Sequence, residues 1–322
     1  MKREFHASDR GLHTGSVGPG GVTVAIACYN HGRFLERCIK SVLAQTQPAG
    51  QIIVVDDGST DRTPEIAQGF EGVHYVFQKN AGLSAARNKA LSLAREPRIL
   101  FLDADDWLTP VALEAASAAF ESSLSPAFVH GSYAEVSEDE KLLMTHVSKP
   151  APDPFLQLLR GNYVAMLGTV LFDTELLRSS GGFDQSLISS EDYDVLLRLA
   201  RRHAVVAYPE IAANYRRHGQ TLSRNRFAML GTGLRVIDRH LSESPKTAPY
   251  LRAARDGRRL VAWYYAQQLR GDFRQAQLRQ GLFRALAALP VSAVMWPRAA
   301  GAIIVRVGAA VTRAAFSAKL WK

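Results

Sequence analysis

Carboxylates gather at two places in the first third of the chain, and each place directly follows a short apolar run. Asp56 and Asp57 follow residues 52–55, and the acidic stretch 103–106 follows residues 99–102. Acids packed this closely repel one another unless a positive charge lies between them. Mg²⁺ is commonly held by one or two carboxylates together with substrate phosphates, and Mn²⁺ accepts similar ligands. The two places therefore indicate a site for Mn²⁺ or Mg²⁺ that carries a phosphorylated ligand.

A simpler explanation is that these acids only cap turns and a helix. Asp103 and Asp105 are two residues apart, so in an extended segment both carboxylates would project to the same side. An Asp-x-Asp sequence alone favours capping, but the second acid pair at a neighbouring strand end reverses that preference. For Asp106 we keep the structural interpretation, an acid at the N-terminal end of a helix that starts at Pro110.

The elements that must position these residues follow from the apolar pattern. Short β-branched runs alternate with helical periodicity from residue 22 onward, which is typical of a parallel sheet covered by helices. The expected strands are residues 22–27, 52–55, 73–77, 99–102, 127–130 and 169–172. Helices are expected over 34–43, after the turn 56–61, over 83–94, from Pro110 and over 192–202. Residues 135–154 are polar and contain proline, and we expect loops there that contact a ligand or an acceptor.

Ligands of an open parallel sheet bind beyond the carboxyl ends of its strands, so the residues that follow each strand are the candidate site. They are Cys28, Tyr29 and Asn30, then Asp56 and Asp57, then residues 79–82, and then residues 103–106. Polar side chains follow all four strands, which indicates a binding edge.

Six short motifs occur in a fixed order over residues 22–225. They are Cys28-Tyr29-Asn30, Val55-Asp56-Asp57-Gly58-Ser59-x-Asp61, Asn80-x-Gly82-x-Ser84-x-Ala86-Arg87-Asn88, Leu102-Asp103-Ala104-Asp105-Asp106, Gly182-Phe183-Asp184 and Glu191-Asp192. Together they resemble the family 2 inverting glycosyltransferases of the GT-A fold. The resemblance implies an α/β domain with a Rossmann-like, mostly parallel sheet flanked by helices, followed by a C-terminal helical region.

The resemblance also implies a role for each motif in donor binding. The strand end Cys28, Tyr29 and Asn30, together with Asp56 or Asp57, would hold the base and ribose of a nucleotide-sugar. The further donor residues that the family pattern implies are Asn80, Gly82, Arg87, Asp103 and Ala104. An ordinary solvent-facing cation on a helix is the alternative for Arg87. One departure from the family is Ala27-Cys28, where many members have a proline, and it leaves the geometry of the base-side loop open.

The implied metal ligands are Asp105, His218 and, through a water molecule, Asp103. His218 follows Arg216 and Arg217, so a diphosphate contact from His218 or from these two arginines is the alternative. A neutral imidazole suits Mn²⁺ more than Mg²⁺.

The acceptor side would be shaped by Gly182, Phe183 and Asp184, with Glu191 and Asp192 at the start of a helix. First-turn acids also favour the helix dipole, which is the simpler explanation for them. The family gives Asp192 the role of general base, and an inverting displacement needs one carboxylate to take the acceptor hydroxyl proton. Asp194 competes for this role, but two residues along a helix it would face elsewhere.

The net charge of +9 is concentrated at the C-terminal end. Residues 251–322 hold eleven arginines and two lysines against two aspartates, and residues 285–322 hold five cations, no acid and many apolar side chains. An anionic membrane surface fits this mixture better than nucleic acid, because no zinc-finger spacing or RNA-binding signature accompanies it. We expect residues 285–322 to lie in a membrane interface, with packing against protein as the alternative.

Three regions follow, namely a flexible N-terminal extension (1–21), a catalytic domain (22–225) and a basic helical C-terminal region (226–322). The only two cysteines predict reduced thiols, and the chain shows neither a signal peptide nor an uninterrupted spanning segment. The expected location is therefore the cytoplasm, with peripheral attachment at the inner face of the cell membrane.

The predicted function is metal-assisted, inverting transfer of a sugar from a UDP-sugar to a glycan or lipid-linked acceptor in cell-surface polysaccharide synthesis. A nucleotidyltransferase or a dehydrogenase would show a glycine-rich phosphate loop after the first strand, and residues 28–32 contain one glycine. A non-catalytic sugar-nucleotide-binding protein of the same fold is the other alternative. The presence of both the metal acids and Asp192 argues against it.

Overall fold

The structure is a computed structural model, which describes residues 21–121, 125–218 and 226–275, with side chains up to residue 269. The expected extension 1–21 therefore falls outside the described residues except for Gly21, and the expected membrane segment 285–322 falls outside them entirely. None of the helices in these described ranges combines the length and the apolar character needed to cross a membrane.

The first part of the chain forms four parallel strands with a helix after each of the first three. The strands are β1 (Val22–Cys28), β2 (Gln51–Asp56), β3 (Val73–Phe77) and β4 (Arg98–Asp103). The helices are α1 (Gly32–Leu43), α2 (Thr63–Gln68) and α3 (Leu83–Leu93). In the registers β1–β2 and β1–β4, Cys28 lies opposite Asp56 and Ala27 opposite Asp103. The carboxyl ends of these strands are therefore level, which confirms the expectation that their polar residues share one edge.

Beyond β4 the sheet becomes mixed. The elements that follow are β5 (Trp107–Leu108), α4 (Ala112–Glu121), β6 (Phe128–Ser137), β7 (Leu142–His146), α5 (Pro154–Arg160), η1 (Leu167–Thr169), β8 (Val170–Asp173), α6 (Thr174–Ser179), α7 (Glu191–Ala200) and β9 (Val205–Arg217). The strand order is β3-β2-β1-β4-β8-β6-β9-β5, with β7 paired to β6. β8 is antiparallel to β4 and β6, whereas β9 runs parallel to β6.

Helices cover both faces of the sheet and enclose two apolar cores. One core lies on the side of α1, α2 and α4 and includes Leu35, Ile39 and Leu113. The other lies on the side of α3, α5, α6 and α7 and includes Phe101 and Phe183. The strands β1, β2 and β4 between these layers are buried on both faces, which explains their continuous apolar runs.

One expectation about the middle of the chain was wrong, and one strand had no expected range. Residues 135–154 were expected to form loops, but β6 continues to Ser137 and pairs with β7 as a hairpin across a turn at Glu140, where φ is 59°. The strand β7 is largely exposed, including its apolar side chains Leu142, Leu143 and Met144, so no buried apolar run marked the hairpin. The strand β9, which had no expected range, extends over thirteen residues and carries Arg216 and Arg217 at its end.

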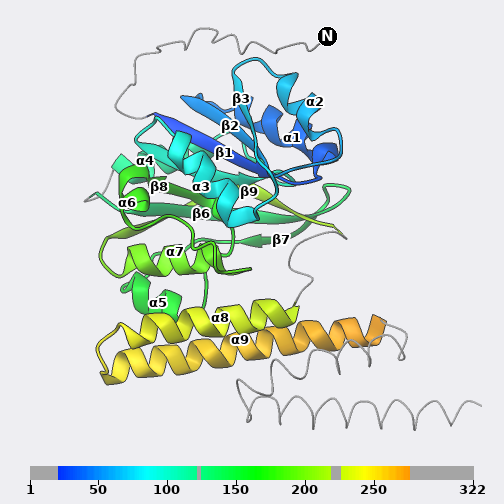
Figure 1. Cartoon of the computed structure of the whole chain (residues 1–322). Coiled ribbons are helices and arrows are strands. Elements are labelled where there is room, and N and C mark those ends of the chain that lie inside the picture. Colours follow the sequence, from blue (N-terminus) through cyan, green and yellow to red (C-terminus); the bar gives the residue numbers. More distant parts are fainter. Residues whose placement is uncertain (1–20, 122–124, 219–225, 276–322) are drawn as a thin grey trace, which may run out of the picture.

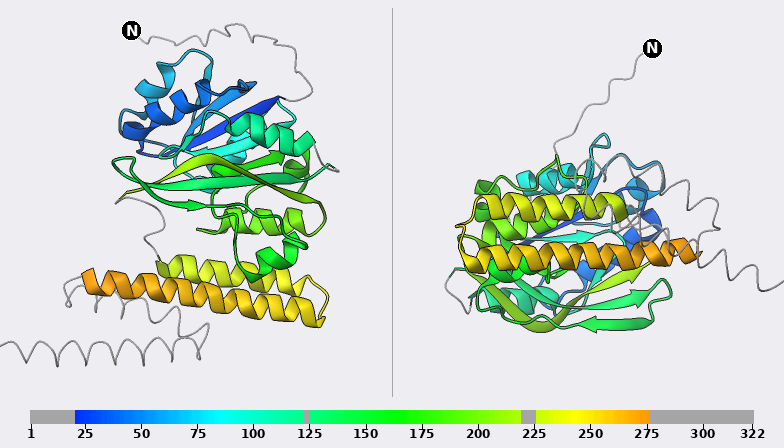
Figure 2. Two further views of the ribbon diagram at one scale, coloured as in Figure 1. Left: turned by 180° about the vertical axis from the view of Figure 1, so that it is seen from behind. Right: turned by 90° about the horizontal axis from the view of Figure 1, so that it is seen from below.

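The chain after residue 225 folds, as far as it is described, into two long antiparallel helices. They are α8 (Arg226–Ser242) and α9 (Ala248–Gln275), which lie side by side below α5 and α7 (Figures 1 and 2). Gly257 permits close packing, because a Cβ there would lie 2.2 Å from the Leu159 carbonyl oxygen at the end of α5. The helical character expected of this region is present in these two helices.

Candidate functional site

The acid pair after β2 is satisfied by donors of β3 and of the neighbouring loops. Asp56 accepts hydrogen bonds from the Ser59 amide at 2.7 Å and from the Tyr75 hydroxyl at 2.8 Å. Asp57 accepts from the Gln78 side chain at 2.7 Å and from the Ala81 and Gly82 amides at 2.8 and 2.9 Å. Both carboxylates are almost fully buried. They shape the loops after β2 and β3, and the expected contact of either with a nucleotide stays a prediction.

Gly58 brings these two loops together. Its φ is +80°, in the left-handed region that favours glycine, and a Cβ at this position would lie 2.8 Å from the Asn80 amide nitrogen. The loop after β3 therefore rests directly against the loop after β2, and the exposed residues Asn80 and Gly82 lie at their junction.

The loop after β1 presents Tyr29 and Asn30 but not the Cys28 side chain. Tyr29 is 50 % exposed, and Asn30 has a positive φ of 53° and accepts from the Thr60 amide at 2.8 Å. The Cys28 thiol lies in the core beside Thr63, and burial raises its pKa to about 11. Of the three residues expected to bind the nucleotide-sugar at this strand end, Tyr29 and Asn30 have side chains that a ligand can reach.

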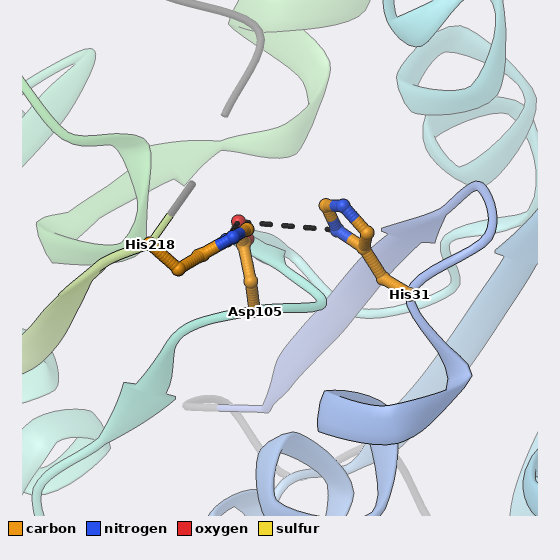
Figure 3. A group of neighbouring side chains, drawn as sticks. All are labelled: His31, Asp105 and His218. Atoms are coloured by element: carbon orange, nitrogen blue, oxygen red, sulfur yellow. Dashed lines mark hydrogen bonds and ion pairs between the residues drawn. The ribbon is translucent and has the colours of Figure 1, made fainter. Parts of the chain in front are cut away.

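In the acid cluster after β4, Asp105 faces two histidines. An Asp105 oxygen lies 2.8 Å from His218 Nε2 and 3.9 Å from His31 Nδ1, so residues that follow β4, β9 and β1 converge (Figure 3). Each of the three residues offers one ligand atom, and these three atoms all lie within 4.8 Å of one another. One carboxylate oxygen and two imidazole nitrogens are a donor set that suits Mn²⁺. The residues present therefore fit the metal that the fold family implies.

His31 was not among the expected metal ligands. It lies in the loop after β1, next to Asn30, and precedes α1. The only signal in the sequence was its position just after a strand end, and that signal is weak because a lone histidine is more often structural. The aromatic contacts of His31 with Phe34 and His218 show how packing brings it to Asp105.

Asp103 and Asp105 do not point the same way, which corrects the expectation from their spacing. The segment after β4 is a turn and not extended, with the Asp106 amide donating to the Asp103 carbonyl at 3.0 Å. Asp103 accepts from Arg87 at 2.8 Å, whereas Asp105 faces the two histidines. Ala104 between them is buried.

Asp106 is structural, as expected, but for another reason. It does not cap a helix. Its buried carboxylate accepts from the Arg216 amide at 2.8 Å, and burial together with the charges of Asp105 and Asp103 holds its pKa well above the ordinary range. The Arg216 guanidinium donates to the Asp105 and Glu138 carbonyls and to Glu140, and lies over the Trp107 ring. These contacts fix the end of β9 and hence the place of His218.

Arg87 joins the turn after β4 to the start of α7. Its side chain is only 5 % exposed, and it donates to Asp103 at 2.8 Å and to Glu191 at 2.7 Å. The expected alternative, an exposed cation on a helix face, is wrong because the guanidinium is enclosed by these two acids and lies over the Phe183 ring. Breaking such a buried pair leaves an uncompensated charge, so Arg87 is a strong positional constraint on both carboxylates.

The pKa values of Asp192 and Asp194, both in the first turn of α7, are shifted in opposite directions. Burial and the neighbouring Glu191 raise the pKa of Asp192 to about 7, against the lowering effect of Arg87. Asp194 is fully buried and accepts from Arg198 at 2.8 Å and from His240 at 3.0 Å. Asp194 therefore ties α7 to α8. Of the two, Asp192 has the environment of a proton acceptor near neutral pH.

The expected acceptor residues Gly182, Phe183 and Asp184 link α3, α6 and α8. Phe183 is buried against Phe101, with ring centroids 5.0 Å apart, and its backbone exchanges two hydrogen bonds with Asn88. Asp184 accepts from Ser186 and Arg239, which lower its pKa to about 2. An open depression of about 460 Å³ is lined by this segment and by Asp194, and not by Asp192. A role of these residues toward an acceptor stays a prediction.

Helix α9 approaches the same region from below. Burial, Tyr264 and the charge of Asp192 raise the pKa of Tyr265 to about 12. The Asp192 carboxylate is therefore within electrostatic range of Tyr265. Helix α8 also approaches the start of α7, since a Cβ at Gly233 would lie 3.9 Å from the Ser190 hydroxyl oxygen.

Comparison with known sequences gives consistent matches. Residues 23–166 match the family described as glycosyl transferase family 2. TuaG of Bacillus subtilis, named as a teichuronic acid biosynthesis glycosyltransferase, is 31 % identical over 214 residues, which cover 64 % of this chain and 82 % of TuaG. Chondroitin synthase of Escherichia coli is 29 % identical over 208 residues, which cover 63 % of this chain. The chain spans only 30 % of that synthase.

Two solved structures share the fold. TarS residues 1–349 of S. aureus, in complex with UDP-GlcNAc, superposes with a TM-score of 0.59 at 19 % identity, over 79 % of this chain and 72 % of that one. The mannosyltransferase PcManGT of Pyrobaculum calidifontis, in complex with GDP-Man and Mn²⁺, gives a TM-score of 0.55 at 18 % identity, over 90 % and 79 % of the two chains. At these identities the likeness concerns the fold.

Proposed function

The chain belongs to glycosyl transferase family 2 and has a GT-A type fold, and we propose that it transfers a sugar from a nucleotide-sugar to an acceptor hydroxyl with inversion at the anomeric carbon. UDP is the proposed nucleotide, because TarS binds UDP-GlcNAc on the same fold. A glycan or lipid-linked acceptor of cell-surface polysaccharide synthesis is proposed from the names of the sequence relatives.

The observation that carries the proposal is the separation of two chemical centres by one ionic bridge. Asp105, His218 and His31 form the first centre, and Asp192 forms the second. Between them, Arg87 binds both Asp103 and Glu191. Nucleophilic displacement at a sugar requires a group that stabilises the leaving diphosphate and another that removes the acceptor proton, and the two centres supply these two requirements.

The first centre is the proposed diphosphate site. Asp105 would hold Mn²⁺ or Mg²⁺, with His218 and His31 as further ligands and Asp103 acting through a water molecule. When bound, the ion would supply Lewis-acid stabilisation of the departing diphosphate. Arg216 and Arg217 are less suited to this task, because Glu140 and Glu135 already pair with them.

The nucleotide would lie over the loops after β1, β2 and β3. Tyr29 offers an exposed ring that can stack on the base, and Asn80 and Gly82 offer polar groups beside it. Asp56 and Asp57 would act mainly by holding these loops in place, since their oxygens accept hydrogen bonds from Ser59, Tyr75 and the loop 78–82.

Asp192 would accept the proton of the acceptor hydroxyl as that oxygen attacks the sugar. Its raised pKa makes it a stronger base than an ordinary aspartate, and at neutral pH a large fraction is still ionised. Glu191 holds Arg87 and so fixes the first turn of α7 beside Asp103.

Release of UDP from UDP-sugars tests this proposal. We expect turnover that requires Mn²⁺ or Mg²⁺, that stops in EDTA, and that rises with a suitable acceptor, with a product of inverted anomeric configuration by NMR. A non-catalytic binding protein would bind UDP-sugar but release no UDP with any acceptor. A nucleotidyltransferase would consume a nucleoside triphosphate and sugar phosphate with release of pyrophosphate, so both assays on one preparation separate the three functions.

A further inference from the structure

The outer face of α9 carries a line of exposed cations that ends in an exposed tryptophan. Arg252, Arg255 and Arg259 are exposed, and Trp263 is 60 % exposed. At 3.6 residues a turn, these four residues fall within about 80° of the helix circumference. We call this set the α9 stripe.

The α9 stripe faces away from the rest of the described molecule. The buried residues of the helix are Ala253, Ala254 and Gly257, which lie on the opposite side of the helical wheel. Gly257 contacts the end of α5, which fixes the rotation of the helix about its axis. In Figures 1 and 2, α8 and α9 form the layer farthest from β1–β3, so the stripe lies on a terminal surface.

The charge of the α9 stripe restricts what can cover it. Asp256, at the edge of the stripe, lies 3.6 Å from Arg255, while no ion pair is recorded for Arg252 or Arg259 among the described residues. Residues 276–322 contain seven cations and no acid, so this segment cannot neutralise the stripe. A second copy meeting the same face would bring like charges together. The complementary surface must therefore be anionic.

We propose that the α9 stripe binds the anionic surface of a lipid membrane. Three arginines on one convex helix face can reach several headgroups at once, while their aliphatic stems lie along the interface. Tryptophan favours the level of the headgroups, where an apolar ring and a polar N–H are both satisfied. A single exposed helix offers no groove of the kind that holds an extended peptide or a nucleic-acid strand.

The opposite side of the same helix places the catalytic groups close to this surface. Tyr265 lies on the side of α9 away from the stripe and within electrostatic range of Asp192, so Asp192 would lie more than one helix diameter, roughly 10 Å, from the lipid headgroups. This consequence rests on the proposed glycosyl transfer. Membrane binding itself does not, and its test below requires no activity.

Vesicle co-sedimentation of the full chain tests the proposal. The vesicles are phosphatidylcholine alone and phosphatidylcholine mixed with phosphatidylserine, and the variant is Arg252→Gln with Arg259→Gln. Because each arginine near an anionic surface contributes a factor of about five, we expect removal of two to cause about a 25-fold loss of affinity for the mixed vesicles. The matched control is Lys89→Gln with Arg95→Gln, two exposed cations on and just after α3, and it should bind like the wild type.

A second variant separates the aromatic part from the charge. Trp263→Ala should weaken binding to the mixed vesicles while leaving its salt dependence unchanged, whereas the double arginine variant should lower the salt dependence. Circular dichroism and the thermal midpoint verify that each variant is folded, as expected for exposed positions.

Three results would overturn the proposal. One is binding of the double arginine variant within twofold of the wild type, and another is equal binding to both kinds of vesicle. The third is an equal loss in the α3 control, since it would reduce the effect to net charge. Capture of a short single-stranded oligonucleotide through the same arginines, without any vesicle binding, would replace the membrane with nucleic acid.

Discussion

The acid pair after β2 and the acid pair after β4 look alike in the sequence but have different partners in the structure. Asp56 and Asp57 accept hydrogen bonds from neutral donors in the loop after β2, on β3 and in the loop after β3. Asp103 and Asp105 instead face the ionic or titratable side chains of Arg87, His218 and His31. The first pair is therefore internally satisfied, whereas the second depends on ionic partners.

The difference teaches that the partners of each carboxylate, more than the spacing of the acids, separate a structural carboxylate from a chemical one. Several hydrogen-bond donors fix a loop whether or not a ligand is present. Asp105 instead faces two imidazoles, and one carboxylate oxygen together with two imidazole nitrogens can hold an ion. On α7 the ionic pairing is structural, because Asp194 is bound by Arg198 and His240, whereas Asp192 has a pKa of about 7.

The largest expected effect is on the transfer rate, and it tests the comparison between Asp192 and Asp194 on α7. Asp192→Asn should lower the rate of sugar transfer by about two to four orders of magnitude, the range for loss of a general base, with little change in UDP affinity. The conservative control is Asp139→Asn, an exposed residue between β6 and β7, which should transfer at the wild-type rate. Steady-state kinetics and calorimetry measure both quantities.

Asp194→Asn is the companion experiment, because it should act on stability. It removes the charge that pairs with Arg198 and His240, so the thermal midpoint should fall while the rate of the remaining folded protein stays near that of the wild type. A crippled rate in Asp194→Asn together with a normal rate in Asp192→Asn would exchange the two assignments.

The second effect is on the free energy of unfolding, and it compares the acid pair after β2 with the acid pair after β4. Asp57→Ala leaves the Gln78 side chain and the Ala81 and Gly82 amides without their acceptor, so the free energy of unfolding should fall by about 2 kcal/mol. Asp105→Ala should change it by less than about 1 kcal/mol, since the lost pair is with histidines. Urea unfolding followed by circular dichroism gives both values, and equal losses would remove the distinction between the pairs.

The last effect is the pH dependence that Asp192 contributes to the stability of the fold. Its pKa of about 7 in the folded protein exceeds the ordinary value of about 3.9, so the unfolded chain gives up this proton first as pH rises. The stability from the neutral form is complete at low pH and is lost as pH rises to about 7. Asp192→Asn should therefore raise the thermal midpoint relative to the wild type more at about pH 8 than at about pH 5.

The transfer rate should also depend on the ionisation of Asp192, but it should rise with pH where the stability falls. Proton abstraction needs the carboxylate, so the transfer rate of the wild type should fall as pH drops below about 7. A midpoint difference between Asp192→Asn and the wild type that is the same at both pH values would mean that Asp192 titrates like an exposed acid.

The parallel strands and their aligned ends could be predicted from the sequence, because they depend on local apolar runs and on the rule for parallel sheets. β1 to β4 were expected within one or two residues of their observed bounds. The hairpin of β6 and β7 could not be predicted in this way, since its exposed residues carry no alternation against a core. Likewise, β9 gains its place from pairing with β6, which is distant in sequence.

The residue types of the candidate site could be predicted from the sequence, but the contacts between these residues could not. The order of the motifs placed Asp105, Asp192 and His218 in one site, but His31 joined it only through packing of the loop after β1. The sequence could not reveal that Arg87 is enclosed between Asp103 and Glu191, because the partners lie 16 and 104 residues away. It also could not reveal that the Cys28 thiol and the Phe183 ring turn into the core.

The most direct test of the account is calorimetry of UDP binding with and without Mn²⁺ in the wild type, Asp105→Ala and Asp57→Ala. We expect Mn²⁺ to strengthen binding in the wild type and in Asp57→Ala, even where the absolute affinity of Asp57→Ala is lower. In Asp105→Ala the affinity should be the same with and without Mn²⁺, because this carboxylate lies between His31 and His218 in the proposed metal site. Mn²⁺ dependence that persists in Asp105→Ala, or that disappears in Asp57→Ala, would contradict the account.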